Sequence, residues 1–321
     1  MKTRKLGNQG LVVSEIGLGC MGMDHGYGLS VDRQAMTKLI QRAVELGCNL
    51  FDTAPIYGYE NEELLGEALK DYKDKVVLAT KFGVTGMETI GDQIVQSLDS
   101  SPESIRKQLD GSLKRLKVDC IDLYYQHRID PKVETEVVAG VMKELISEGK
   151  IKYWGLSNAP IDYIRRAHAV CPITAIEDQY SMMWRKPEHG LFQVCDELEI
   201  GFVAYSPLGN GFLSGKYTKD TKYQDGDFRN MMGRFKPEVI DQNQALLDLI
   251  AQIAESKNAT SAQIVLAWEL AQKPYIVPIP GTTKLHRLEE NFGVANIQLT
   301  AEELAGINES LSEIDIDETF F

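Results

Sequence analysis

Four ionisable side chains stand at the ends of three short apolar runs, and together they could reduce a carbonyl group. Asp52 and Tyr57 lie in FDTAPIYG, Lys81 in ATKFG and His127 in YYQHR. Carbonyl reduction needs a general acid for the developing alkoxide. Tyr57 can be that acid if the Lys81 cation makes its phenolate easier to form. Because no protein side chain donates hydride, this chemistry requires a nicotinamide cofactor.

The other two side chains have matching roles. Asp52 would hold the ammonium group of Lys81 charged and in place, and His127 would polarise the carbonyl oxygen or relay a proton. Each residue alone has a common structural alternative, since such side chains also cap loops, snorkel from strand ends or pack. Their joint position at the ends of three successive apolar runs favours catalysis.

The elements that must position these residues alternate between β-rich runs and amphipathic segments. We expect strands at 16–20, 49–53, 76–81, 121–126, 153–156, 175–179, 201–205 and 275–279. We expect helices at 32–46, 61–71, 101–116, 134–148, 161–169, 188–198, 237–271 in two pieces, and 284–291. Eight strands with helical crossovers predict an α/β fold, a (β/α)8 TIM barrel, as a single domain over residues 1–321.

Three segments lie outside this repeat. Turn residues at 7–10 predict an N-terminal β-hairpin that could plug the bottom of the barrel, and 300–314 has the pattern of an extra C-terminal helix. The irregular stretch 209–236 is longer than an ordinary loop and is a candidate lid or cofactor clasp. The tail after Ile314 is short, so we expect it to leave little lid.

GLGCMG at 17–22 matches the G-x-G-x-x-G fingerprint of dinucleotide-binding βαβ units. That fingerprint needs a helix to open on its last glycine, whereas a glycine-rich loop follows here. We therefore predict that GLGCMG is the first strand and its exit, and that Met21, Met23 and Tyr27 contact substrate at the pocket mouth.

Composition limits the partners. The net charge of −13 opposes binding to nucleic acid or anionic membranes, and no apolar run approaches the ~18 residues that span a bilayer. We see no secretory signal, and five cysteines without a C-x-x-C pair suggest reduced thiols, so we expect a cytoplasmic protein. The histidines lack metal-ligand spacing, which predicts no metal site. The oligomeric state stays open.

Over essentially its whole length, the chain resembles the aldo-keto reductases, which are NADP-dependent barrel enzymes. The resemblance rests on FDTAPIYGYENEELLGEAL, ATKFG, SLKRLKVDCIDLYYQHRID, GLSN, VAYSPLGNGFLSGKY and IPGTTKLHRLEEN, in the family's order and spacing. It implies a catalytic tetrad of Asp52, Tyr57, Lys81 and His127, with no departure from the family pattern at these positions.

A cofactor site is predicted where IPGTTK closes the eighth strand and opens a helix, because backbone N–H groups there can bind phosphate. The resemblance implies that Thr283, Lys284 and Arg287 contact the 2′-phosphate, which favours NADPH/NADP+ over NAD. The alternative is that these cations are merely solvated. The other implied cofactor contacts are Gly281 in the IPGTTK motif, Glu290 and Asn291 at the adenine, Ser157, Asn158 and Gln179 at the carboxamide, Tyr205 stacked on the nicotinamide, and Ser206, Pro207, Leu208, Gly209 and Gly211 around the pyrophosphate.

We therefore predict an NADPH-dependent oxidoreductase that reduces aldehydes or ketones, with Tyr57 as general acid. Met21, Met23, Tyr27 and Trp184 would line an adaptable pocket for small or aromatic carbonyl compounds. One alternative is a regulatory NADPH-binding subunit resembling potassium-channel β-subunits, which could keep the tetrad yet turn over slowly. A barrel lyase or isomerase would bind no nicotinamide.

Overall fold

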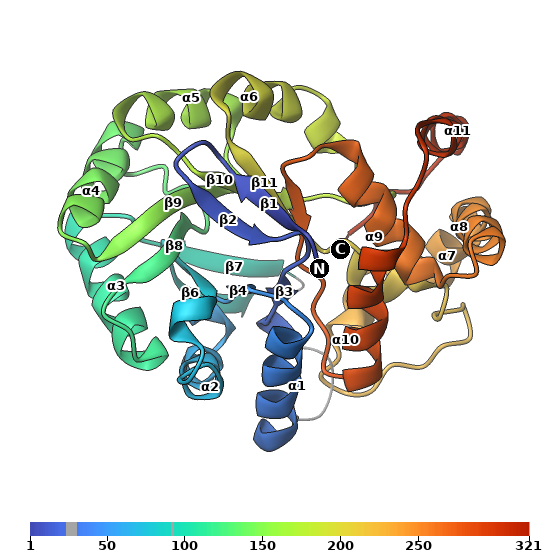
Figure 1. Ribbon diagram of the computed structural model, residues 1–321, viewed down its shortest axis with the longest axis horizontal. Coiled ribbons are helices and arrows are strands. Elements are labelled where there is room, and N and C mark those ends of the chain that lie inside the picture. Colours follow the sequence, from blue (N-terminus) through green and yellow to red (C-terminus); the bar gives the residue numbers. More distant parts are fainter. Residues whose placement is uncertain (24–30, 91–92, 321) are drawn as a thin grey trace.

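Eight parallel strands form the centre of the molecule, as the sequence predicts (Figure 1). The structure is a computed structural model, and it describes residues 1–23, 31–90 and 93–320. The strands pair in the order β12-β11-β10-β9-β8-β5-β4-β3. Their bounds are β3 Leu18–Gly19, β4 Leu50–Asp52, β5 Val77–Phe82, β8 Ile121–Gln126, β9 Ile151–Ser157, β10 Ala175–Gln179, β11 Gly201–Tyr205 and β12 Ile276–Pro278. The predicted (β/α)8 fold is confirmed.

The first and last strands meet at a seam that requires glycine. The backbone N–H of Gly17 donates to the carbonyl oxygen of Pro278 at 2.9 Å. A Cβ atom on Gly19 would lie 2.7 Å from the carbonyl oxygen of Ile279, which is closer than carbon and oxygen can approach. The glycines of GLGCMG therefore let two backbones pack together. A 3₁₀ turn, Met21–Met23, contains the last of these glycines.

An N-terminal hairpin closes one end of the barrel, as predicted. Strands β1 (Thr3–Leu6) and β2 (Leu11–Ser14) pair antiparallel, and Leu6 and Val13 are buried in one apolar cluster with Val203 and other residues of the barrel strands. Arg4 ties this hairpin to the far end of the chain. Its guanidinium group donates to the carbonyl oxygens of Leu270, Lys273 and Ile276 at 2.6–2.8 Å.

Helices surround the sheet (Figure 1). Their bounds are α1 Arg33–Glu45, α2 Tyr59–Ala68, α3 Pro102–Leu116, α4 Thr135–Ser147, α5 Ile161–Val170, α6 Leu191–Leu198, α7 Pro237–Gln242, α8 Gln244–Ser256, α9 Ser261–Gln272, α10 Leu285–Phe292 and α11 Ala301–Glu313. Side-chain caps fix several starts: Asp32 accepts from the N–H of Gln34, and Thr260 and Thr300 each form a capping box. The stretch 237–271 contains three helices rather than the two pieces that the sequence predicts.

Two features lie between the barrel elements. An antiparallel hairpin of β6 (Val84–Ile90) and β7 (Gln93–Leu98) is inserted between β5 and α3, and the sequence analysis missed it. The predicted irregular stretch 209–236 contains three short 3₁₀ turns, Gly209–Ser214, Phe228–Asn230 and Gly233–Phe235. In the described parts of the chain, each helix is too short or too polar to cross a membrane.

Candidate active site

A cavity of about 820 Å³ opens where the barrel strands end, which is a size typical of sites for small ligands. Side chains from strand ends form its floor, including Asp52, His127 and Tyr205. The β6–β7 hairpin contributes Met87 and Gln96 to its wall. The stretch 209–236 also borders the cavity, in keeping with its predicted place as a lid or clasp.

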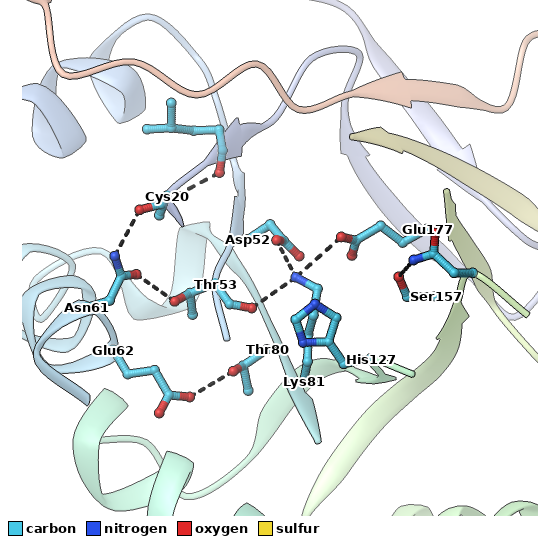
Figure 2. Close-up of polar contacts among 12 residues, drawn as sticks. Cys20, Asp52, Thr53, Asn61, Glu62, Thr80, Lys81, His127, Ser157 and Glu177 are labelled. Carbon is cyan, nitrogen blue, oxygen red and sulfur yellow. Dashed lines mark hydrogen bonds and ion pairs between the residues drawn. The ribbon is translucent and has the colours of Figure 1, made fainter. Parts of the chain in front are cut away.

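Lys81 on β5 lies beneath this cavity and is completely buried (Figure 2). Its Nζ is 2.5 Å from Oδ1 of Asp52, 3.0 Å from the carbonyl oxygen of Thr53 and 3.3 Å from Oε1 of Glu177. Burial opposes the charge on Lys81, but the two carboxylates outweigh burial and raise the pKa of the ammonium group above its usual value. Lys81 is therefore a fixed cation at neutral pH.

Tyr57 ends a 3₁₀ turn, Pro55–Tyr57, that follows β4 directly. The centre of its ring is 5.4 Å from Nζ of Lys81 and 5.8 Å from the ring of His127, which it meets edge to face. Burial raises the pKa of the Tyr57 hydroxyl, and the charge of Lys81 acts in the opposite direction. The phenol is thus protonated at neutral pH, next to the cation that stabilises its phenolate.

A buried asparagine on α2 fixes the loop that carries Tyr57. Asn61 donates to the carbonyl oxygen of Cys20 at 2.9 Å and accepts from the Thr53 hydroxyl at 2.6 Å (Figure 2). These two bonds join the start of α2 to the ends of β3 and β4. Tyr57 lies between Thr53 and Asn61 in the chain, so the bond between these two residues closes the loop that positions it.

His127 follows the last residue of β8, and its backbone N–H donates to the carbonyl oxygen of Phe82 at 2.8 Å. Burial, Lys81 and Arg128 lower the pKa of its imidazole well below the usual value. His127 is therefore neutral at pH 7, with one ring nitrogen able to donate a hydrogen bond and the other able to accept one. The structure thus brings the four predicted catalytic residues into one cluster.

The structure adds Glu177, which the sequence analysis did not select. Glu177 lies on β10 in register with Ser157 of β9, and only 3% of its surface is exposed. Its Oε1 contacts Lys81, whereas its Oε2 has no hydrogen-bond partner among the described residues. Because residues two apart on a strand share a face, its spacing from Gln179 was a signal that both point into the barrel.

The opposite end of the cavity is basic. Lys216, Lys284 and Arg287 line it, and none of the three forms an ion pair with a described residue. Arg287, partial burial, Arg229 and Lys284 lower the pKa of Lys216, in that order of importance. In a chain with a net charge of −13, such mutually repelling cations at one point fit an anionic ligand. Lys216 was not selected from the sequence.

The remaining predicted cofactor residues lie mostly along the same cavity. Its lining includes Ser157, Gln179, Tyr205, Ser206, Pro207, Leu208, Gly211, Gly281, Thr283, Glu290 and Asn291. The amide of Asn158 lies 2.7 Å from the Ser157 hydroxyl and 2.8 Å from the Tyr205 hydroxyl. Gly209 lies deeper, where a Cβ would be 2.8 Å from the sulfur of Met183. This continuous row of polar groups fits a long, anionic cofactor.

Comparison with known proteins decides the family. A profile of the Aldo/keto reductase family matches residues 15–312. The chain belongs to the aldo/keto reductase family. Membership makes it an oxidoreductase that acts on carbonyl compounds.

Solved structures of similar proteins agree with this assignment. A glycerol dehydrogenase from Gluconobacter oxydans is 27% identical over 99% of this chain and 98% of its own, with a TM-score of 0.88. An aldo-keto reductase from Bacillus halodurans, solved in its holo form, is 27% identical over 97% and 96%, with a TM-score of 0.79. An aldo/keto reductase from Klebsiella pneumoniae, solved with NADP and acetate, shares the fold at 23% identity over 96% and 95%, with a TM-score of 0.75.

The predicted substrate residues of this aldo/keto reductase fall in different places. Met21 lines the cavity. Met23 is buried in the apolar core, and Trp184 packs under the ammonium group of Lys186 at 3.9 Å from its ring centre. Tyr27 lies outside the described residues. Other apolar residues, which were not selected from the sequence, also line the cavity, namely Ile56, Met87, Phe228, Met232 and Phe320.

The C-terminal tail of this reductase reaches the cavity, contrary to our expectation. The backbone of Asp317 exchanges two hydrogen bonds with the Asn243 amide, at 3.0 and 3.1 Å. This anchor brings Phe320 to the cavity wall, where its ring lies 4.3 Å from the guanidinium carbon of Arg234. Length alone was misleading, because a side-chain anchor directs even a short tail across the opening.

All five cysteines are free thiols, and four of them are buried. Within residues 1–23, 31–90 and 93–320, no three His, Cys, Asp or Glu side chains gather in a way that could hold a metal ion.

Proposed function

We propose that this chain is an NADPH-dependent reductase of aldehydes and ketones, with Tyr57 as its general acid. The observation that carries this proposal is the buried Lys81 cation, held by Asp52 beneath the Tyr57 ring at the floor of the cavity. A lysine that served only to stabilise the barrel would not need a protonated phenol beside it. This pair supplies a proton donor whose conjugate base is stabilised in place.

A nicotinamide supplies the hydride when the cofactor is bound. Ser157, Asn158 and Gln179 would hold its carboxamide, and Tyr205 would stack on its ring. Residues 206–211 would wrap the pyrophosphate. The unpaired cations at the other end of the cavity, with Thr283, would hold the 2′-phosphate of NADPH, and Glu290 and Asn291 would contact the adenine. The Klebsiella pneumoniae relative, solved with NADP, supports this assignment.

The residues of the chain handle the proton. As the carbonyl carbon accepts hydride, its oxygen takes the proton from the hydroxyl of Tyr57, which leaves an alcohol and a phenolate. The Lys81 ammonium stabilises that phenolate until a proton from solvent restores the phenol. Neutral His127 would donate its ring N–H to the carbonyl oxygen and fix its orientation. The three groups converge from β5, from the end of β8 and from the turn after β4.

The substrate class we propose is small or aromatic aldehydes and ketones. Methionine and aromatic side chains border the cavity, which suits flat apolar groups of varied shape. Phe320 and the β6–β7 hairpin narrow the opening, so we expect bulky steroid ketones to be poor substrates. Turnover confined to steroid ketones would contradict this choice.

The cellular compartment and the class of partner that we propose follow from the composition of the chain. Five free thiols fit a reducing compartment such as the cytoplasm, and the net charge of −13 disfavours nucleic acid as a partner. Cell fractionation with an antibody to the chain tests the compartment.

The test combines binding with turnover. The purified protein is titrated with NADPH and NADH by fluorescence quenching, and 4-nitrobenzaldehyde is then added while the nicotinamide absorbance is followed. We expect NADPH to bind more tightly and to be oxidised steadily. Tyr57→Phe should lower kcat by about 10²–10⁴-fold, the usual contribution of a general acid, with the Kd for NADPH within about two-fold of the wild-type value.

Three other outcomes would change the conclusion. Wild-type kcat in Tyr57→Phe would remove Tyr57 from the acid role. Tight NADPH binding without turnover on any carbonyl compound would favour a regulatory subunit. Absence of binding to both cofactors would contradict the proposal as a whole.

A further inference from the structure

Lys81 is in contact with two carboxyl groups rather than one. Asp52 and Glu177 both contact its ammonium group, and all three side chains are buried. With both carboxyl groups ionised, this cluster at the floor of the cavity has a net charge of −1, and burial and Asp52 raise the pKa of Glu177 to about 8, so this charge forms at alkaline pH. A buried ion pair that served stability alone would need one carboxylate, because the second adds a desolvation cost.

Glu177 is also incompletely bonded. Buried carboxylates normally have hydrogen-bond partners on both oxygens, yet Oε2 of Glu177 has none among the described residues, and the residue lines the cavity. Figure 2 shows the carboxyl groups of Asp52 and Glu177 next to each other, both in contact with the ammonium group of Lys81. One oxygen thus contacts the lysine, and the Glu177 carboxyl group is also within hydrogen-bond reach of the Asp52 carboxyl group when one of the two is protonated.

The ionisable groups around Glu177 come from several elements. They are Asp52 on β4, Lys81 on β5, Tyr57 in the turn after β4, Tyr125 on β8 and Tyr205 on β11. The charge of Arg128, which follows β8, acts to lower the pKa of Tyr57 and Tyr205. Lys81 is the cation in direct contact with Glu177. A change in the charge of Glu177 therefore acts mainly on the field that Lys81 exerts at Tyr57.

We propose that Glu177 is a positioning residue that acts as a second counter-ion of Lys81. Its charge sets the pH at which Tyr57 exchanges its proton, and thereby the balance between carbonyl reduction and alcohol oxidation. This inference rests on the proposed role of Tyr57 as the acid. Reduction needs the phenol, because a proton must pass to the carbonyl oxygen as hydride reaches carbon. Oxidation of the alcohol needs the phenolate, because the same proton and hydride travel back.

The direction of the effect follows from charge. An ionised Glu177 offsets part of the positive field of Lys81, so the phenolate of Tyr57 is harder to form. Burial and the neighbouring Asp52 raise the pKa of Glu177, yet Glu177 is ionised in the alkaline range where a phenol titrates. The charge therefore extends reduction to higher pH and delays oxidation.

The test compares charged and neutral residues at position 177. Glu177→Gln keeps the shape and removes the charge, and the pair Glu177→Asp and Glu177→Asn differs only in charge. Glu269→Gln is the matched control, because Glu269 is a completely buried carboxylate on α9 outside the cavity. The pH profiles of kcat/KM are measured for 4-nitrobenzaldehyde with NADPH and for 4-nitrobenzyl alcohol with NADP+.

We expect Glu177→Gln to move the apparent pKa of both profiles downward by about one unit, the usual scale for one neighbouring charge. On the alkaline side, reduction then falls by up to about ten-fold while oxidation at lower pH rises. Glu177→Asp should keep the wild-type profile, and Glu177→Asn should shift like Glu177→Gln. The control variant should not shift.

Unshifted profiles in Glu177→Gln would overturn the inference. If Glu177→Gln is insoluble, identical pH profiles for Glu177→Asp and Glu177→Asn would overturn the inference instead. These results are distinct from failure of the proposed function, which retained activity of Tyr57→Phe would reveal. A purely structural role of Glu177 would change stability or KM without moving the apparent pKa.

Discussion

Replacing Lys81 with methionine removes a buried charge while keeping most of the side-chain volume. The ammonium group contacts Asp52 Oδ1, the carbonyl oxygen of Thr53 and Glu177 Oε1, at 2.5, 3.0 and 3.3 Å. In the variant, two buried carboxylates face each other without a cation. The structure therefore predicts a loss of stability that arises from charge rather than from packing.

The magnitude follows from the complete burial of the group. Removing one partner of a buried ion pair costs about 3–5 kcal/mol. An unfolding entropy of about 2.1 cal/mol/K per residue gives roughly 0.7 kcal/mol/K for 321 residues, so a loss of about 4 kcal/mol lowers Tm by about 6 °C.

The pH dependence has a definite sign. In the Lys81→Met variant, burial and mutual repulsion raise the carboxyl pKa values of Asp52 and Glu177 above their unfolded values near about 4. The folded variant then binds more protons than the unfolded chain and gains stability as the pH falls towards about 5. In the wild-type protein burial also raises these carboxyl pKa values, but Lys81, which stays protonated over this range, limits the rise, so the wild-type protein gains less stability as the pH falls. The deficit of the variant should therefore shrink between pH 8 and pH 5.

Urea unfolding followed by circular dichroism, at pH 5, 6.5 and 8, measures this deficit. The double variant Lys81→Met/Glu177→Gln should recover part of the loss at pH 8, because one of the two uncompensated carboxylates is gone. A deficit below about 1 kcal/mol, or one equal at pH 5 and pH 8, would refute the argument, because intact buried pairs cost about 3–5 kcal/mol to break.

Two further predictions concern the cofactor end and the seam. Lys284→Ala with Arg287→Ala should weaken NADPH at least about ten-fold more than NADH in fluorescence titrations, because in the proposed function the lost cations would face the 2′-phosphate, and equal losses would exclude that role. Gly19→Ala should lower the unfolding free energy by about 1–3 kcal/mol, since its Cβ would meet the carbonyl oxygen of Ile279. The control Gly140→Ala on α4, where nothing lies within 4 Å of the new Cβ, should raise it by about 0.5–1 kcal/mol, so similar values for both variants would contradict the seam argument.

The barrel strands were predictable because parallel strands are buried on both faces. The run of β11, GFVAY, shows this pattern, and the predicted bounds of β8, β10 and β11 match the structure. The β6–β7 hairpin lacks it. Its sequence, VTGMETI followed by QIVQSL, mixes polar and apolar residues, and even its apolar Met87 and Val95 are nearly half exposed. The Gly-Asp dipeptide between the two runs was the available hairpin signal.

The site was predictable where chemistry follows a strand end directly. Asp52, Lys81 and His127 are of this kind. Glu177 and Lys216 are not, because their roles depend on neighbours that are distant in sequence. Spacing along β10 shows which face Glu177 occupies, but only the closed barrel brings it to Lys81. Lys216 belongs to the basic end of the cavity because Arg287 lies close enough to repel it. Phe320 reaches the cavity because Asn243 anchors the C-terminal tail.

The seam between β3 and β12 has a consequence for synthesis. The two strands lie about 260 residues apart in the chain, so at about 5–20 residues per second β3 emerges from the ribosome roughly 13–50 s before its partner exists. During that interval the sheet has an open edge able to pair with other chains. The guanidinium group of Arg4 likewise lacks its hydrogen-bond acceptors until the carbonyl groups of residues 270–276 have been synthesised. Nascent chains that stall before residue 276 are therefore the species most in need of a chaperone.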